Sequence, residues 1–271
     1  MHVDARLCMI EDDSVTTSDF LVQERQARIR EKLAASGRVL AGDLAVEFSV
    51  SEDTIRRDLR EMAAAGLCQR VYGGALAPIP PTAPFMERVT DQPERKRALA
   101  RAAARSIEPA MLVFLDASST NLAIAEEISA SFGVTVATNA PRIATALMES
   151  VDVILIGGMV DRRVGGAVGG KASSDAGLLR PDLCILGACG VDAEAGITAF
   201  QLEDAEFKRM IARRSRAVMT TATVKKLGTA APYDVIGIAE CERLVVEHDA
   251  DGEAIRDIVA LGVEIIRADK I

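Results

Sequence analysis

The 271-residue sequence is poor in the residues that form base-stacking platforms and metal sites. It has no tryptophan, an aromatic content of 3%, two histidines, and five scattered cysteines without a CxxC pair. Non-specific binders of single-stranded nucleic acid stack bases on aromatic side chains, and structural zinc sites use clustered Cys and His. The composition therefore argues against both classes, and we expect neither a metal nor a cofactor.

Long apolar runs are also missing. No stretch approaches the roughly 20 apolar residues of a membrane-spanning helix, and the N-terminus lacks a basic-then-apolar signal. An odd, scattered set of cysteines fits a reducing compartment, with Cys184 as a small core residue. We expect a cytoplasmic protein without membrane contact.

Positive charge is scarce overall but unevenly placed. The net charge is -8, yet residues 25–75 hold nine Lys or Arg against seven Asp or Glu, whereas residues 1–24 hold one against six. A mildly basic segment in an acidic protein fits a local contact with a polyanion.

The basic segment contains a helix pattern that exposes arginines, SEDTIRRDLREM, residues 51–62. Ser51 suits the N-cap, and Ile55, Leu59 and Met62 recur on one face. At about 100° per residue, the other side of the wheel carries three arginines, Arg56, Arg57 and Arg60.

The surrounding pattern predicts a winged helix-turn-helix, whose third helix enters the DNA major groove. Two helical stretches, RQARIREKLAASG and GDLAVEF, precede a turn at Ser49-Val50, and Gly73-Gly74 can close a hairpin afterwards. We expect base contacts from Arg56 and Arg60, and phosphate contacts from the helix start and the wing. The candidate DNA-binding residues are Ser51, Thr54, Arg56, Arg57, Arg60 and Arg70.

Two alternatives stay open for this segment. The arginines can be solvated, with Asp53 and Arg57 forming an i, i+4 ion pair. The winged helix can also serve protein contact only, in which case DNA affinity is weak and insensitive to Arg56 and Arg60.

From about residue 94 onward, apolar runs alternate with helical patterns. The runs lack polar alternation, which is typical of strands buried on both faces, and cover 111–116, 134–138, 151–158, 182–190, 216–221, 243–247 and 263–266. The helical candidates are 94–107, 120–131, 140–149, 171–179, 203–214 and 253–261. This alternation predicts an α/β domain with a mostly parallel sheet.

Small polar residues follow three of the predicted strands, where open parallel sheets bind ligands. Hydroxyls and backbone N–H groups at a helix start form an anion site, and a lysine after a later strand can neutralise a phosphate. The candidate effector-binding residues are Asp116, Ser118, Ser119, Thr120, Thr138, Asn139, Gly157, Gly158 and Lys226. The alternatives are a helix cap at Ser118 to Thr120 and a plain turn at Gly157-Gly158.

Two further charged residues have plain structural interpretations. Asp192 can take a sugar hydroxyl but suits a turn better. Lys208 lies on a helix beside Glu203 and Glu206, which indicates a solvated charged face.

The stretch FSVSEDTIRRDLREMAAAGLCQRVYGGA resembles the DNA-binding signature of DeoR-type transcriptional regulators. PFMERV, FLDASST, ATNAPRIA, LIGGMV, ILGACGVDAEAGIT and TTATVKKLGTAAPYDV extend the resemblance to about residue 266. It implies a sensor domain similar in fold to ribose-5-phosphate isomerase and glucosamine-6-phosphate deaminase. It also implies a cytoplasmic bacterial regulator, usually a repressor, that forms dimers or tetramers and responds to a phosphorylated sugar or polyol. Family members often have glycine where this chain has Ser118.

These observations divide the chain into four parts. Residues 77–84, APIPPTAP, hold four of the nine prolines and predict a stiff linker. We expect a flexible acidic tail at 1–23, a winged helix-turn-helix domain at 24–76, a proline-rich linker at 77–90 and an effector-sensing domain at 91–271.

An enzymatic alternative is a sugar-phosphate isomerase or amino-sugar-phosphate deaminase with an appended DNA-binding module. That chemistry needs a general base near the sugar, for which Glu203, Asp204 and Glu206 are candidates. No residue is clearly marked as that base and a sensor needs no turnover, so we expect a regulator and not an enzyme.

Overall fold

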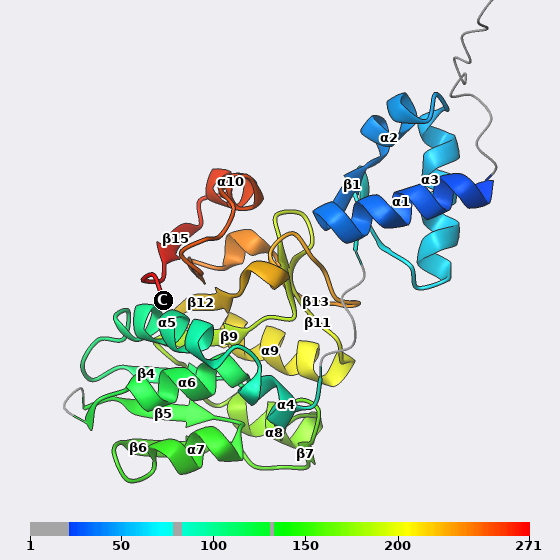
Figure 1. Cartoon of the computed structure of the whole chain (residues 1–271). Helices are drawn as coiled ribbons and strands as arrows, with labels where there is room; N and C mark the ends of the chain where they lie inside the picture. Colours follow the sequence, from blue (N-terminus) through cyan, green and yellow to red (C-terminus); the bar gives the residue numbers. More distant parts are fainter. Residues whose placement is uncertain (1–21, 78–82, 131–132) are drawn as a thin grey trace, which may run out of the picture.

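The computed structural model describes residues 22–77, 83–130 and 133–271. A small N-terminal domain precedes a larger α/β domain (Figure 1). Of the predicted acidic tail, residues 1–21 lie outside the described part, and Val22 already begins the first helix. Most of the proline segment, residues 78–82, also lies outside it.

The N-terminal domain has the predicted order of helix, helix, turn, helix and hairpin. Its helices are α1 (Val22–Ser36), α2 (Ala41–Glu47) and α3 (Glu52–Ala64). Its strands, β1 (Arg38–Leu40), β2 (Gln69–Val71) and β3 (Gly74–Leu76), form an antiparallel sheet in the order β1-β3-β2. β1 was not predicted, because three residues carry no readable period and the strand depends on its pairing with β3.

The wing depends on its glycine pair. Gly73 has a φ of 82° in the turn between β2 and β3. A Cβ on Gly74 would lie 2.0 Å from the carbonyl oxygen of Val39, so only glycine lets β3 approach β1 this closely. The hairpin that Gly73-Gly74 predicted is present and is packed against β1.

The C-terminal domain contains a seven-stranded parallel sheet, built from the seven predicted apolar runs. Its strand order is β15-β14-β12-β9-β4-β5-β6. The strands are β4 (Leu112–Leu115), β5 (Thr135–Thr138), β6 (Asp152–Leu155), β9 (Leu183–Gly187), β12 (Ala217–Ala222), β14 (Arg243–Val246) and β15 (Glu264–Arg267). The predicted parallel sheet is therefore confirmed.

Helices cover both faces of this sheet (Figure 1). On one face, Val113 and Leu115 pack with α5 (Pro93–Ala104), α6 (Ser119–Glu127) and α7 (Pro141–Leu147). On the other, Phe114 and the fully buried Cys184 pack with α8 (Gly170–Ala176), α9 (Leu202–Arg214) and α10 (Gly252–Ala260). Burial on both faces explains why the strands lack polar alternation.

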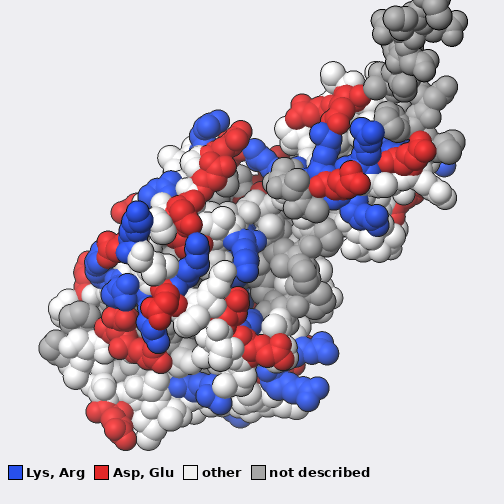
Figure 2. Space-filling model, in the orientation of Figure 1, with Lys and Arg blue, Asp and Glu red and all other residues white. Residues whose placement is uncertain are grey.

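Several short elements were not predicted. They are α4 (Phe85–Thr90), which lies within the predicted linker, the hairpin β7 (Val160–Asp161) and β8 (Gly166–Ala167), a small antiparallel sheet of β10 (Gly190–Asp192), β11 (Gly196–Ala199) and β13 (Tyr233–Ile236), and the 3-10 helices η2 (Val224–Lys226) and η3 (Ile238–Glu240). Figure 2 shows basic and acidic side chains interspersed over the visible face of the C-terminal domain. No helix in the described ranges has both the length and the apolar character needed to cross a membrane.

The chain order of the strands reverses between β4 and β9. From β4 the chain adds β5 and β6 on one side, and then returns to place β9, β12, β14 and β15 on the other. Such a switch point leaves a crevice at the carboxyl ends of the two strands, and ligands of open α/β sheets bind there. We therefore expect a ligand site among the residues that follow β4 and β9.

Candidate functional site

The helix α3 is capped and anchored as its sequence predicts. The Ser51 hydroxyl accepts a hydrogen bond from the backbone N–H of Thr54 at 3.2 Å. On the inner face Ile55, Leu59 and Met62 are buried. Asp58, also buried, accepts hydrogen bonds from Arg25 of α1, one of them at 3.1 Å. This ion pair fixes α3 against α1 and leaves the arginine side of α3 exposed.

The three arginines of α3 differ in their partners. Arg56 pairs with Glu52 and Asp53, at 2.6 and 3.3 Å. Arg57 pairs with Glu61 at 3.3 Å, so the predicted Asp53–Arg57 pair is wrong: Asp53 lies beside Arg56 instead. Within the part of the chain that the structure describes, Arg60 makes no ion pair.

The wing adds two exposed side chains. Arg70 is exposed on β2, which a contact with the DNA backbone requires. Tyr72 is 93% exposed at the tip between β2 and β3. Tyr72 was not among the predicted site residues, although an aromatic residue next to the glycine pair of a predicted wing could have indicated an exposed side chain at the tip.

A cavity at the β4–β9 switch point gathers side chains from six segments of the C-terminal domain. Ser118 and Ser119 come from the start of α6, and Gly187 to Cys189 from the end of β9. The charged residues of its lining are Arg88 of α4, Arg163 of the β7–β8 hairpin, Asp204 and Lys208 of α9, and Lys226 of η2. Four cations and one carboxylate therefore line the cavity.

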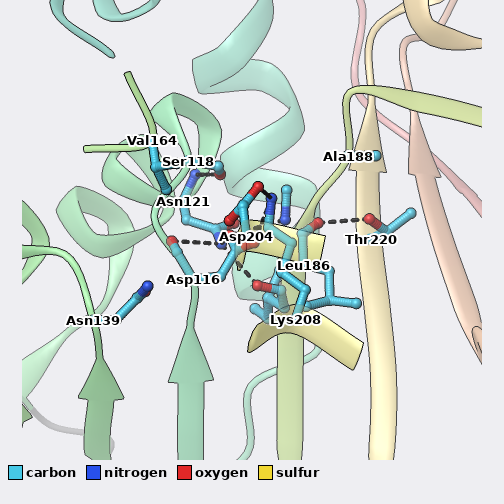
Figure 3. A network of polar contacts seen from close by, with 12 residues as sticks. Asp116, Ser118, Asn121, Asn139, Val164, Leu186, Ala188, Asp204, Lys208 and Thr220 are labelled. Carbon is cyan, nitrogen blue, oxygen red and sulfur yellow. Dashed lines mark hydrogen bonds and ion pairs between the residues drawn. The ribbon is translucent and has the colours of Figure 1, made fainter. Parts of the chain in front are cut away.

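A buried ion cluster forms one wall of this cavity (Figure 3). The Lys208 ammonium lies 2.7 Å from Asp204 and 3.4 Å from Asp116. Asp116 also accepts hydrogen bonds from Asn121 and from the backbone N–H of Gly187, which ties β4 to β9. Burial works to lower the pKa of Lys208, but the two carboxylates outweigh it and the pKa is raised. Burial raises the pKa of Asp116 to about 6, although Lys208 opposes the shift.

Two further cations of the cavity, Lys226 and Arg88, donate hydrogen bonds to carbonyl oxygens. Lys226 donates to the carbonyl oxygen of Ala188 at 2.7 Å. Arg88 donates to the carbonyl oxygens of Arg163 and Val164, both at 2.9 Å, and to that of Ala83 at 3.1 Å. Burial lowers the pKa of both side chains. Among the described residues, neither side chain forms an ion pair with a carboxylate.

The cavity is small in this conformation. Its volume is about 30 Å³, which is close to the share of one water molecule in the liquid. Val164 of the β7–β8 hairpin lines it, and a Cβ on the neighbouring Gly165 would lie 2.3 Å from the Phe85 ring of α4, so the hairpin and α4 are closely packed. A ligand larger than water requires part of the cavity lining to move.

The predicted effector residues separate into two groups. Ser118, Ser119 and Lys226 line the cavity. Ser118 is also the N-cap of α6, because its hydroxyl accepts from the backbone N–H of Asn121. Its side chain faces Gly187, where a Cβ would lie 2.2 Å from that of Ser118. The serine that replaces the common glycine is thus accommodated by a glycine on the facing strand.

The remaining predicted residues do not line the cavity. Asp116 and Thr120 are buried behind it. Thr138 and Asn139 are also buried, and Asn139 donates to the carbonyl oxygen of Ala167 beneath the β7–β8 hairpin. Gly157 and Gly158 are exposed after β6, at the edge of the sheet. The expected crevice over β4, β5 and β6 is replaced by one over β4, β9 and β12, because the chain inserts β9 beside β4.

The sequence analysis missed Arg88, Arg163 and Cys189, and it misjudged Lys208. Lys208 is not on a solvated face: its side chain is 4% exposed, with Asp204 one helical turn before it. The i, i+4 spacing of Asp204 and Lys208 was a readable signal for that pair. Asp192 holds a turn as expected, accepting from the N–H groups of Glu194 and Ala195.

A larger cavity, about 770 Å³, lies elsewhere and is lined by Lys32 and Arg38 of the N-terminal domain and by Asp192 and Asp251 of the C-terminal domain. Both signs of charge line it, and it is not at the strand ends of the parallel sheet. We therefore take the smaller cavity at the switch point as the candidate effector site.

Comparison with known proteins assigns both domains. A DeoR-like helix-turn-helix domain matches residues 25–79, and a DeoR C terminal sensor domain matches residues 91–248. The HTH-type transcriptional regulator GlpR of Haloferax volcanii is 30% identical over 91% of this chain and 98% of that protein. The Glycerol-3-phosphate regulon repressor of Escherichia coli is 33% identical over 80% of this chain and 87% of that protein.

A winged helix that exposes arginines, joined to a sensor domain, defines a DNA-binding transcriptional regulator. The chain belongs to the DeoR family. Its relatives are regulators, so the enzymatic alternative does not apply to this chain. Among solved structures, ribose 5-phosphate isomerase A of Methanocaldococcus jannaschii aligns with a TM-score of 0.38 at 10% identity, over 50% of this chain and 55% of that chain, a likeness too slight to carry an argument.

Proposed function

We propose that the protein is a repressor whose DNA affinity is controlled by a phosphorylated sugar or polyol bound in the cavity at the β4–β9 switch point. The supporting observation is the excess of cations over carboxylates in that cavity. Lys226 and Arg88 are satisfied only by neutral carbonyl oxygens in the described residues. A dianionic phosphate offers both cations a charge partner, and Asp204 can accept from a sugar hydroxyl.

The names of two relatives support the same ligand class. The repressor of Escherichia coli is named for the glycerol-3-phosphate regulon, and the relative in Haloferax volcanii is named GlpR. These names describe those proteins. For this chain they favour a small phosphorylated polyol or sugar.

The test is thermal unfolding against a panel of sugar and polyol phosphates with their unphosphorylated partners. A ligand at 100 times its Kd adds about 2.7 kcal/mol to the free energy of unfolding. We expect one phosphorylated compound to raise the Tm of the wild type and of Lys225→Gln, whose side chain is exposed beside the site. Lys226→Gln should lose the shift. An equal shift from an unphosphorylated partner, or an unchanged shift in Lys226→Gln, contradicts the proposal.

The DNA contacts proposed for the N-terminal domain are Ser51, Thr54, Arg56, Arg57, Arg60 and Arg70. Their support is that α3 is anchored by its inner face and by Asp58 while its arginines stay exposed. We also propose the domain division 24–76, 77–90 and 91–271, a cytoplasmic location and a homo-oligomer. Regulators with helix-turn-helix domains bind repeated half-sites as oligomers. Sedimentation that shows only a monomer at working concentration contradicts the last point.

A further inference from the structure

Arg88 occupies a position that joins three parts of the C-terminal domain. Its guanidinium lines the cavity, stacks over the Phe85 ring at 5.2 Å, and donates to the carbonyl oxygens of Arg163 and Val164 in the β7–β8 hairpin. It also donates to the carbonyl oxygen of Ala83. Ala83 directly follows residues 78–82, through which the chain continues from the DNA-binding domain.

The same helix is held from its other end by a second cation. The Lys96 ammonium donates to the carbonyl oxygens of Arg88 and Asp91, at and just after the last turn of α4. Lys96 is buried and belongs to α5, which packs on the parallel sheet. The six-residue helix α4 is thus held by the buried Lys96 at its C-terminal end and by the Arg88 contacts to Ala83 and the hairpin.

The cavity of about 30 Å³ is too small for a phosphate ion in this conformation, so part of its lining must move for such a ligand to enter. That lining includes Arg163 and Val164 of the hairpin that Arg88 binds. No carboxylate of the described residues hydrogen-bonds to Arg88, and Asp204 and Asp116 act on its charge only at longer range, where they oppose the lowering of its pKa by burial. A phosphate offers the guanidinium a negatively charged acceptor that can take two parallel N–H bonds, which neutral carbonyl oxygens cannot match.

We propose that Arg88 binds the effector and also couples the effector site to the linker. The phosphate of the ligand accepts hydrogen bonds from the Arg88 guanidinium, which then no longer donates to the carbonyl oxygens of Ala83, Arg163 and Val164. The exchange frees the hairpin, so that the cavity opens, and it releases the start of α4, to which the DNA-binding domain is connected. This inference rests on the proposed phosphate site. It gives the ligand a differential interaction with two states, which any effector requires.

Hydrogen exchange with mass spectrometry tests the proposal, with ribose 5-phosphate, glycerol 3-phosphate and inorganic phosphate as probes. Ligands normally protect the segments they touch. Here we expect α9, which carries Lys208, to become protected, while residues 83–90 exchange about tenfold faster because their local opening becomes easier. In Arg88→Gln, residues 83–90 should exchange fast without ligand and respond little to it. Arg97→Gln, an exposed arginine of α5 paired with Glu94, is the matched control and should behave as the wild type.

The outcomes separate the two proposals. If no probe raises the Tm of the wild type or protects α9, the phosphate site itself is wrong and the role of Arg88 falls with it. If a probe binds, and binding depends on Lys226, but residues 83–90 of the wild type are unchanged or protected, the role of Arg88 is wrong and the phosphate site stands. The wild-type measurement decides the matter even if Arg88→Gln folds poorly.

Discussion

The arginines of α3 and the cations of the switch-point cavity are both clusters of positive charge, but they are built in opposite ways. The α3 arginines come from one helix and are exposed, and two of them, Arg56 and Arg57, pair with carboxylates of the same helix. The cavity cations come from α4, α9, η2 and the β7–β8 hairpin, and two of them are held by carbonyl oxygens alone among the described residues. The exposed cluster costs the fold little and is free to meet DNA, whereas the buried cluster costs desolvation that a ligand anion can offset.

The largest expected effect separates the two clusters by stability. Lys208→Met leaves Asp204 and Asp116 buried without their cation, which should cost about 3–5 kcal/mol. Arg57→Met removes an exposed i, i+4 pair with Glu61 and should cost only about 0.3–0.5 kcal/mol. Urea unfolding of both variants measures the difference. Similar losses in the two would show that burial does not distinguish these cations.

A second effect concerns pH. Burial lowers the pKa of Lys96 to about 8, against the opposing influence of Asp91. A lysine with a lowered pKa in the folded state binds fewer protons there than when unfolded, so stability rises with pH. Relative to Lys96→Arg, which stays charged, the wild type should gain up to about 3 kcal/mol as the pH rises from about 8 towards 10.5.

Chemical unfolding of the two proteins at a series of pH values measures this gain. Lys96→Met, which has no titrating group at the position, should lack the rise as well. A constant difference between the wild type and both variants over this range would mean that Lys96 is not desolvated in the folded protein.

The smallest effect is on DNA binding and ranks the arginines of α3. Arg60→Ala should weaken specific DNA by about 1–3 kcal/mol if the side chain reads a base. Arg57→Ala should weaken it less, since Glu61 already holds that side chain. Fluorescence anisotropy on a site found by in vitro selection measures both, and unfolding should be unchanged for these exposed residues. Equal affinities and sequence preference for Arg60→Ala and wild type would refute the base-reading role.

Much of the fold could be read from local sequence. All seven predicted strands and all six predicted helices of this domain are present, because buried parallel strands and their helices leave strong, continuous apolar patterns. The short elements were not predicted. β1, the strands β7 and β8, and α4 are two to six residues long, and their stability comes from contacts distant in sequence. One of them, α4, carries Arg88 in a segment that its prolines had assigned to the linker.

The candidate site was only partly predictable for the same reason. Ser118 and Lys226 were found because each follows a strand, and strand ends can be read along the chain. Thr138, Asn139 and Gly157 also follow strands, yet they do not line the cavity. Which strand ends meet depends on the order of strands in the sheet, and that order is not written in any one segment.

The sequence by itself determined the arginine-bearing helix α3, since its cap, apolar face and arginines all lie within one helix and need only the geometry of a single helix. It also determined the layered α/β domain through the continuous apolar runs. Only the tertiary structure decided the cavity at the switch point. It placed β9 beside β4, turned Lys208 inward to Asp116, and brought Arg88 under the β7–β8 hairpin. These contacts join residues 70 to 92 positions apart, and such pairings are set by topology and packing, not by local propensity.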